Sequence, residues 1–129
     1  MTTFQKETKV WGTVRHLFAA SNAAVSYLEV KAGFRCSRHK HMHRANLFAV
    51  VDGAIIVEEW AADMLDQPDD EHLRRTRLCS GEVLVVPSGV LHRFRVVESG
   101  HVVEVYWPDM GVDLDDIERL DVGGPDVEL

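Results

Sequence analysis

The sequence is poor in cysteine and has no long apolar run. Two cysteines in 129 residues are too few for a disulfide framework, so we expect reduced thiols and a cytoplasmic protein. A membrane-spanning helix needs about 18 consecutive apolar residues, and no run approaches that length. The N-terminal residues lack the apolar core of a secretory signal. These absences favour a soluble globular protein without a membrane partner.

Basic residues form no stripe, and the net charge of −7 is concentrated near the C-terminus. Residues 109–129 hold eight of the 21 acids but one of the 14 bases, Arg119. Proteins that bind nucleic acid present a basic face, so this distribution argues against a nucleic acid partner. We interpret residues 109–129 as an acidic, solvated tail that aids solubility.

Short apolar segments separated by glycine make up most of the chain. With 46% hydrophobic and 27% charged residues, residues 1–129 suit one domain with a single core. Segments rich in β-branched and aromatic residues recur about every ten residues, which is typical of an all-β barrel or sandwich. The predicted strands are residues 9–17, 24–31, 46–51, 54–60, 76–79, 82–87, 90–97 and 101–107.

Two glycine-containing segments predict turns between these strands, and one segment predicts a helix. Asp52-Gly53 predicts a hairpin, because glycine accepts the positive φ of a tight turn. Glu98-Ser99-Gly100 predicts a second turn. Residues 113–121 carry apolar side chains at helical spacing and predict a short C-terminal helix.

Two histidines one residue apart carry the strongest chemical signal. On an extended segment, His39 and His41 point to the same side. With a third imidazole from another strand, they can bind a divalent metal and leave coordination positions open. His92, which follows a proline–glycine turn, is the candidate for that third imidazole. A histidine-rich surface loop is the alternative for the pair alone.

These segments resemble the two motifs of the cupin family. Motif one, residues 33–53, has the spacing Gly-x5-His-x-His-x4-Glu-x6-Gly, here filled by Gly33, His39, His41, Asn46 and Gly53. Motif two, residues 81–96, has the spacing Gly-x5-Pro-x-Gly-x2-His-x3-Asn, here filled by Gly81, Pro87, Gly89, His92 and Val96. Every spacing fits, and asparagine and valine replace the family's glutamate and asparagine. The resemblance implies a small cupin barrel, also described as a double-stranded β-helix or jelly roll.

A closer resemblance is to the cupin domain of type II mannose-6-phosphate isomerases. SRHKHMHRANLFAVVDG, residues 37–53, is similar to that family's His-x-His-Arg-Ala-Glu segment and the strand after it. Further similar segments extend the resemblance over residues 9–122. The guanylyltransferase domain that often precedes this module has no counterpart here. Residues 122–125 replace the family's Tyr-Gly-Arg, whose arginine the resemblance implies in phosphate or proton handling.

The departure at position 46 leaves the ligand set open. The family's glutamate supplies an anionic oxygen, whereas Asn46 offers a neutral amide oxygen that binds a metal weakly or through water. Three histidines favour zinc, nickel, iron, manganese or copper over magnesium or calcium. Glu104, alone on an otherwise apolar predicted strand, restores a carboxylate if it points inward, and is an ordinary exposed acid if it does not.

The resemblance also implies catalytic and binding residues. Aldose–ketose isomerisation needs a base, and Glu104 and His43 are the candidates; His43 can also be a further ligand. Arg44, kept from the family's Arg-Ala pair, and Lys40 are candidates for binding substrate. The aromatic residues expected to line the same pocket are Phe48 and Tyr106. Arg93 and Arg95 have the opposite parity to His92, so we predict that they lie on a solvated face.

Three functions fit these residues. The first is a metal-dependent sugar or sugar-phosphate isomerase or epimerase. The second is a dioxygenase or decarboxylase with a metal held by three histidines, and the third is a non-catalytic module that binds a sugar or small anion. Each implies a small-molecule partner. We also expect a homodimer formed through an edge strand, because short open barrels expose unpaired edges.

Overall fold

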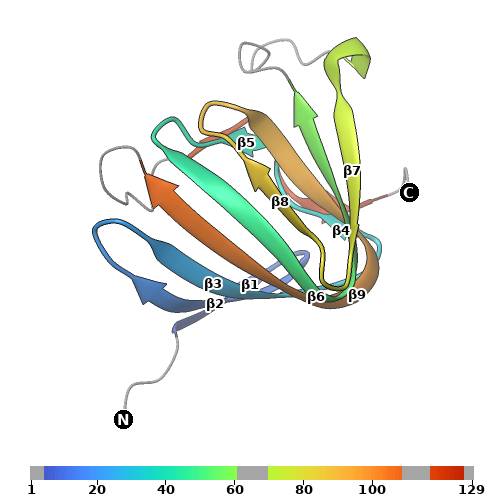
Figure 1. The fold of residues 1–129 in the computed structure, drawn as a ribbon. Coiled ribbons are helices and arrows are strands. Elements are labelled where there is room, and N and C mark those ends of the chain that lie inside the picture. Colours follow the sequence, from blue (N-terminus) through green and yellow to red (C-terminus); the bar gives the residue numbers. More distant parts are fainter. Residues whose placement is uncertain (1–4, 61–69, 109–116, 127–129) are drawn as a thin grey trace.

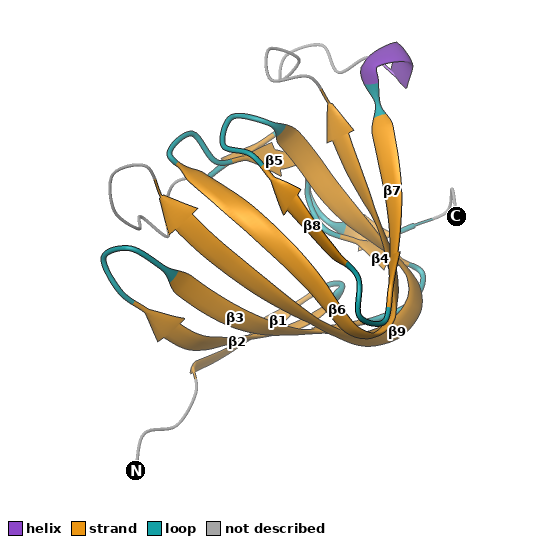
Figure 2. Cartoon of the chain, viewed as in Figure 1, coloured by secondary structure: helices purple, strands orange, loops and turns teal. Residues whose placement is uncertain are grey.

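The computed structural model describes residues 5–60, 70–108 and 117–126, which form eleven strands and one short 3-10 turn. The strands are β1 Gln5–Lys9, β2 Gly12–Ala19, β3 Ala24–Val30, β4 Phe34–Arg35, β5 His39–Lys40, β6 Arg44–Trp60, β7 Arg74–Cys79, β8 Val83–Val86, β9 Leu91–Pro108, β10 Glu118–Arg119 and β11 Gly124–Pro125. The turn η1 spans Asp70–His72. Figure 2 shows how completely strands dominate, so the all-β prediction is confirmed.

Two long strands, β6 and β9, run through both halves of the molecule and pair antiparallel along their lengths (Figure 1). In one half they lie between β3 and β8, with β2 and β1 beyond β3. In the other half β6 pairs with β7, and β9 pairs with β4 and β5. The sheet curls so that the two halves face each other across one interior.

The predicted turns at Asp52-Gly53 and Glu98-Ser99-Gly100 are wrong, because both segments lie inside continuous strands. Gly53 has a φ of +82°, and a Cβ there would lie 2.7 Å from the carbonyl oxygens of Glu98 and Ser99. A Cβ at Gly100 would approach the carbonyl oxygen of Asp52 more closely still. The register of β6 against β9 shifts at this point. The two glycines therefore allow the close backbone approach of a β-bulge, at which β6 and β9 bend together from one half of the molecule into the other.

Apolar side chains from both halves fill the interior. The buried cluster comprises Trp11, Val14, Leu28, Val30, Cys36, Phe48, Val50, Ile55, Val57, Leu78, Val86, Phe94, Val96 and Val102. Trp11 and Phe94 pack edge to face with ring centroids 4.9 Å apart, and Phe48 contacts Phe94 at 6.1 Å. These aromatic contacts form a floor beneath the histidines, since Phe48 also packs on His92 at 6.2 Å.

The predicted C-terminal helix is wrong over the part that the structure describes. Residues 113–116 lie outside the described residues, and Glu118–Arg119 forms β10, which pairs with β5. Further on, β11 pairs with β4, and the Leu120 amide donates to the Arg38 carbonyl at 2.8 Å. Backbone pairing with motif one thus overrides the local helical pattern. We call residues 117–126 the C-terminal strap.

Arg93 and Arg95 are 7% and 4% exposed, so the prediction that they lie on a solvated face is wrong. Arg93 Nε donates to Glu58 Oε1 at 2.6 Å, and Arg95 Nε donates to Asp126 Oδ2 at 2.5 Å. Arg75 Nε donates to the other oxygen of Glu58 at 2.8 Å. Both arginines do point away from His92, as the parity requires. That face is buried because the strap and β6 bring acids onto it.

One sheet edge exposes apolar side chains. Within the described part of the chain, β8 pairs with β6 alone, and its Val83 and Val85 are 53% and 43% exposed. Dimerisation through an edge strand stays a prediction. Among the described residues, no helix has the length and apolarity that crossing a bilayer requires.

Candidate metal centre

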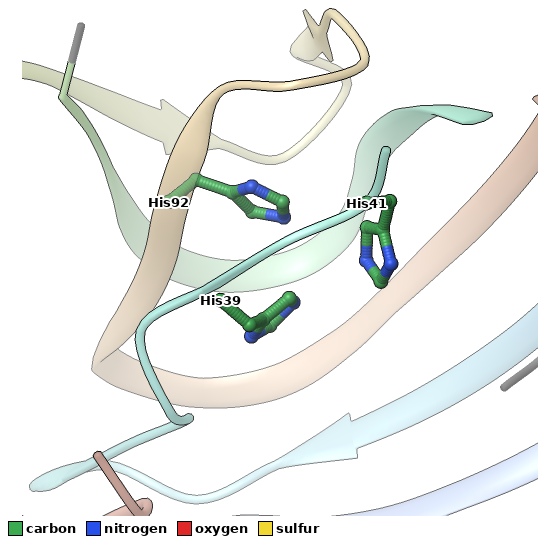
Figure 3. A group of neighbouring side chains, drawn as sticks. All are labelled: His39, His41 and His92. Atoms are coloured by element: carbon green, nitrogen blue, oxygen red, sulfur yellow. The ribbon is translucent and has the colours of Figure 1, made fainter. Parts of the chain in front are cut away.

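Three imidazoles meet at one end of the interior. His39 lies on β5, His41 follows that strand directly, and His92 is the second residue of β9, opposite His39 in the ladder. One ring nitrogen from each lies within 4.8 Å of the others. Figure 3 shows the three rings gathered around a common space. The cluster therefore brings both sequence motifs together.

Backbone carbonyls fix the tautomers of two of these rings. His39 Nδ1 donates to the Ser37 carbonyl at 2.8 Å, and His92 Nδ1 donates to the Val90 carbonyl at 2.9 Å. A carbonyl only accepts, so Nδ1 carries the proton and Nε2 presents a lone pair. Metal-ligating histidines are held in the same way, with the second nitrogen bonded to a carbonyl or carboxylate.

Burial keeps the imidazoles of His39 and His92 neutral. Burial, together with the charge of Arg44, lowers the pKa of His92 to about 4. Burial and the neighbouring His92 and His41 hold the pKa of His39 well below its usual value. The Nε2 of His92 is buried and has no hydrogen-bond partner among the described residues. A buried acceptor left in this state fits a divalent metal, which needs neutral imidazole lone pairs.

A carboxylate stands beside the cluster, on a different strand from the one the family motif uses. Glu104 on β9 points inward and is 8% exposed. It accepts a hydrogen bond from Asn46 Nδ2 at 2.8 Å and one from the Tyr106 hydroxyl at 2.6 Å. The family has a glutamate at position 46. In this chain, Asn46 at that position instead holds the carboxylate of Glu104 by a hydrogen bond. Glu104 is outside the three-histidine group, which separates it from the metal ligands.

Burial raises the pKa of Glu104 above its ordinary value, although the hydrogen bond from Tyr106 and the charge of Arg44 oppose that rise. Burial and the adjacent Glu104 likewise hold the pKa of Tyr106 well above its usual value. The tyrosine hydroxyl thus stays protonated and remains a donor. A carboxylate with a raised pKa is a stronger proton acceptor, which suits general-base chemistry.

A cavity of about 830 Å³ opens onto this group. Its walls include His39, His41 and Glu104, together with the predicted binding residues Arg44, Phe48 and Tyr106. The Arg44 guanidinium lies 4.0 Å from the centre of the Tyr106 ring, a cation–π contact. The volume lies in the range of sites that enclose a small molecule.

Two predicted site residues lie elsewhere. Lys40 is outside the cavity lining, and its Nζ lies 3.9 Å from a carboxylate oxygen of Glu118. His43 is exposed and outside the three-histidine group. Parity predicted that His43 points to the same side as His41. The segment after His41 leaves the extended conformation, so His43 does not follow His41 inward.

One polar group on this wall carried no prediction. His16 on β2 has its Nδ1 3.2 Å from Ser26 Oγ and its Nε2 3.2 Å from Glu7 Oε1. Ser26 is the cross-strand partner of Glu104, so the contacts of His16 extend toward the candidate base. Glu7, His16 and Ser26 come from three strands, and their proximity depends on strand register. A single sequence gives no signal for that register.

The sequence matches the family described as mannose-6-phosphate isomerase C-terminal over residues 1–122. No curated protein matches this chain. Similar solved structures are CapF from Staphylococcus aureus, a capsular polysaccharide assembling protein (TM-score 0.73, 18% identity, 95% of this chain and 33% of CapF), oxalate decarboxylase from Bacillus subtilis (TM-score 0.72, 17% identity, 91% and 30%), and KdgF from Halomonas sp. (TM-score 0.65, 17% identity, 83% and 86%).

These similarities establish fold and family. The chain spans about a third of the length of CapF and of oxalate decarboxylase, and identities near one in five carry the fold alone. The shared architecture is the cupin fold, and another oxalate decarboxylase structure from B. subtilis is described as having Mn(II) centres. Because the family match covers nearly the whole sequence, this chain belongs to the mannose-6-phosphate isomerase C-terminal family of cupins.

Proposed function

We propose that this protein is a divalent-metal enzyme that isomerises a sugar or a sugar phosphate. The observation that carries the proposal is the juxtaposition of three imidazoles with the buried carboxylate of Glu104, which lines the same cavity as two of them. Family membership supports the same reaction class. The reaction transfers a proton between adjacent carbons, and these residues supply the two groups it requires.

The metal ligands in this proposal are His39, His41 and His92. Three imidazoles suit zinc, nickel, iron, manganese or copper. Bound there, the metal supplies positive charge that stabilises the negative charge developing on the substrate oxygens. The phenylalanine and tyrosine rings around the cluster limit access of water to the reacting carbons.

Glu104 is the proposed base. Its carboxylate removes a proton from the carbon beside the carbonyl and returns it to the former carbonyl carbon, while a hydroxyl proton moves between the two oxygens. Asn46 and Tyr106 each donate to one of its oxygens, which fixes the orientation of the carboxylate. Arg44, packed on Tyr106, is the proposed contact for substrate oxygens on the same wall.

The test begins with metal reconstitution and elemental analysis, followed by incubation with mannose 6-phosphate and detection of the ketose by NMR. Glu104→Gln is expected to lower kcat about 10²- to 10⁴-fold while the metal content stays at the wild-type level. Glu98→Gln is the matched control, because Glu98 is an exposed glutamate on the same strand. It is expected to retain full activity.

A metal-loaded protein that turns over no sugar or sugar phosphate would contradict the isomerase proposal. Oxygen uptake by the iron- or copper-loaded protein would indicate a dioxygenase, and carbon dioxide release from a small carboxylic acid would indicate a decarboxylase. Ligand-induced thermal stabilisation with no turnover of any kind would indicate a binding module.

A further inference from the structure

A row of polar side chains crosses the sheet from its outer edge to Glu104. Strands β1, β2, β3 and β9 are neighbours in that order (Figure 1). His16 on β2 lies opposite Ser26 on β3, and Ser26 lies opposite Glu104 on β9. Residues directly opposite each other in an antiparallel pair project to the same face. These three side chains therefore share the interior face, and Glu7 on β1 extends the row beyond His16.

The row connects the buried interior with solvent. Ser26 and Glu104 are 2% and 8% exposed, whereas the side chains of His16 and Glu7 are 32% and 46% exposed. Glu7, His16 and Glu104 line the cavity, and Ser26 lies behind its surface. A ligand that fills the cavity covers Glu104 from water but leaves this path within the wall intact.

Hydrogen bonds fix the direction of donation at the outer end of the row. Bonds from Lys9 and His16 hold the pKa of Glu7 below its ordinary value, so Glu7 is a carboxylate that only accepts. His16 Nε2, which lies 3.2 Å from Glu7 Oε1, therefore carries a proton. In the neutral imidazole, Nδ1 then has a lone pair, which accepts the hydroxyl proton of Ser26 across 3.2 Å. The outer part of the row is thus a continuous chain of donors and acceptors.

Ser26 bridges the gap between His16 and Glu104. Neighbouring strands lie about 4.8 Å apart, so residues two strands apart are about 10 Å apart, too far for direct proton transfer. The Cβ atoms of directly opposite residues lie about 4.5–5.5 Å apart, a span that a hydroxyl and a carboxyl group close directly or through one water. Each Glu104 oxygen accepts one bond, from Asn46 or from Tyr106, and keeps a second lone pair for a proton.

The two ends of this bridge also interact electrostatically. Burial raises the pKa of Glu104, and the charge of His16 is among the influences that oppose the rise. Imidazole is the side chain whose ordinary pKa lets it gain and lose a proton near neutral pH. A histidine at this position therefore has the chemistry to pass protons between a buried carboxyl group and water.

We propose that Ser26 and His16 relay protons between Glu104 and solvent, so that the hydrogen taken from the substrate exchanges with water. The inference rests on the proposed function and adds a route for proton exchange to it. The O–H bond of protonated Glu104 breaks as Ser26 Oγ gains that proton, and Ser26 gives its own proton to His16 Nδ1. His16 then releases its Nε2 proton to Glu7 or to water. A solvent proton that moves in the reverse direction restores every group, so the net change is one substrate hydrogen for one solvent hydrogen.

The experiment isomerises mannose 6-phosphate with the metal-loaded protein in deuterium oxide and measures the deuterium in the ketose by NMR at low conversion. Ser26→Ala and His16→Gln are expected to lower the deuterium incorporated per turnover about tenfold and to change kcat less than about threefold. His101→Gln is the matched control, because His101 is also half-buried and bonded to a carboxylate, that of Asp52, but lies outside the cavity lining. It is expected to incorporate deuterium as wild type does.

The ratio of exchange to turnover separates a relay from a structural role. Wild-type incorporation per turnover in both variants would overturn the inference, and a wild-type product without deuterium would overturn it as well. A loss of kcat with unchanged incorporation per turnover would instead assign the two residues to holding the base in place. If Ser26→Ala fails to fold, His16→Gln decides, since His16 lies at a half-exposed position.

A second measurement needs no substrate. In the zinc-loaded protein, ¹⁵N NMR of the His16 ring is expected to show the proton on Nε2. Ser26→Ala is expected to shift the Nδ1 resonance of His16 and to leave that of His101 unchanged. A proton on Nδ1 of His16 would overturn the relay whatever the activity. The expected tautomer in a protein that turns over no sugar would refute the proposed function and leave the relay standing.

Discussion

The two faces of β9 near its start are both buried, but their polar groups differ in how far their hydrogen bonds are satisfied. On the inner face, His92 is 2% exposed, and its Nε2 has no hydrogen-bond partner among the described residues. On the outer face, Arg93 and Arg95 are almost as deeply buried, and both donate to carboxylates. Directly adjacent residues of one strand thus belong to an incomplete polar site on one face and to a satisfied ionic network on the other.

The difference separates function from stability. Buried charges that are fully paired hold a structure together locally, and removing one partner leaves the other uncompensated. Buried lone pairs without donors cost stability, and they persist where a ligand completes them. The inner face therefore has the properties of a binding site. The outer face has the properties of an ionic network that holds β6, β7, β9 and the strap together.

The largest expected effect breaks the inner face. His92→Ala removes one of three ligands, and we expect the loss of stoichiometric metal after reconstitution, because two imidazoles do not retain a divalent ion against competing chelators. Elemental analysis after gel filtration measures it. His101→Ala is the control, because His101 is a half-buried histidine later on the same strand and outside the cluster, and this variant should keep its metal. Full metal content in His92→Ala would refute the three-histidine site.

The next effect breaks the outer face. Glu58→Ala leaves Arg93 and Arg95 buried without their shared carboxylate. Breaking a buried pair in this way costs about 3–5 kcal/mol of unfolding free energy. Urea denaturation measures the loss, with Glu98→Ala as the control for an exposed acid on β9. The folded fraction should still bind metal; wild-type stability in Glu58→Ala would show that the network contributes nothing.

A smaller effect follows from pH. Burial alone would raise the pKa of Glu58, but Arg93, with help from Arg75 and Arg95, holds it below the ordinary value of 4.5. The carboxylate therefore contributes stability that is complete above its unfolded-state pKa and is lost as pH falls through the lower folded-state value. Between about pH 5 and 2.5, the unfolding free energy measured by urea denaturation should fall more steeply for wild type than for Glu58→Gln. Parallel curves would contradict this assignment.

The smallest effect compares the two thiols. Cys36 is buried against the cavity wall and accepts the Phe94 amide at 3.2 Å, and burial raises its pKa to about 12. Cys79 is exposed at the end of β7. Because the thiolate is the reactive form, iodoacetamide at pH 8 should label Cys79 and spare Cys36 in the folded protein. Mass spectrometry of the labelled peptides measures this, and equal labelling would show that the interior opens readily.

Alternation and motif spacing predicted the strands and brought His39, His41 and His92 to one place. A single sequence gives no strand pairing, and the errors at the two glycines, at the two arginines and in the C-terminal segment came from that. Gly53 and Gly100 read as turns, because one sequence does not show that the two glycines face each other across a bulge. The buried state of Arg93 depends on Glu58 from another strand. The helical pattern around Leu120 was overridden by a ladder with residues some eighty positions earlier.

The order in which the site is assembled follows from the strap. During synthesis, all three histidines have been incorporated once His92 is added, and the rest of β9 follows directly. Besides β9, the partners of β4 and β5 are β11 and β10, which are synthesised after every other described strand. The segment that carries His39 and His41 therefore waits for the final strands before its outer edge is paired. Until translation reaches Asp126, a ribosome-bound chain contains every proposed ligand but lacks the strap that pairs with β4 and β5.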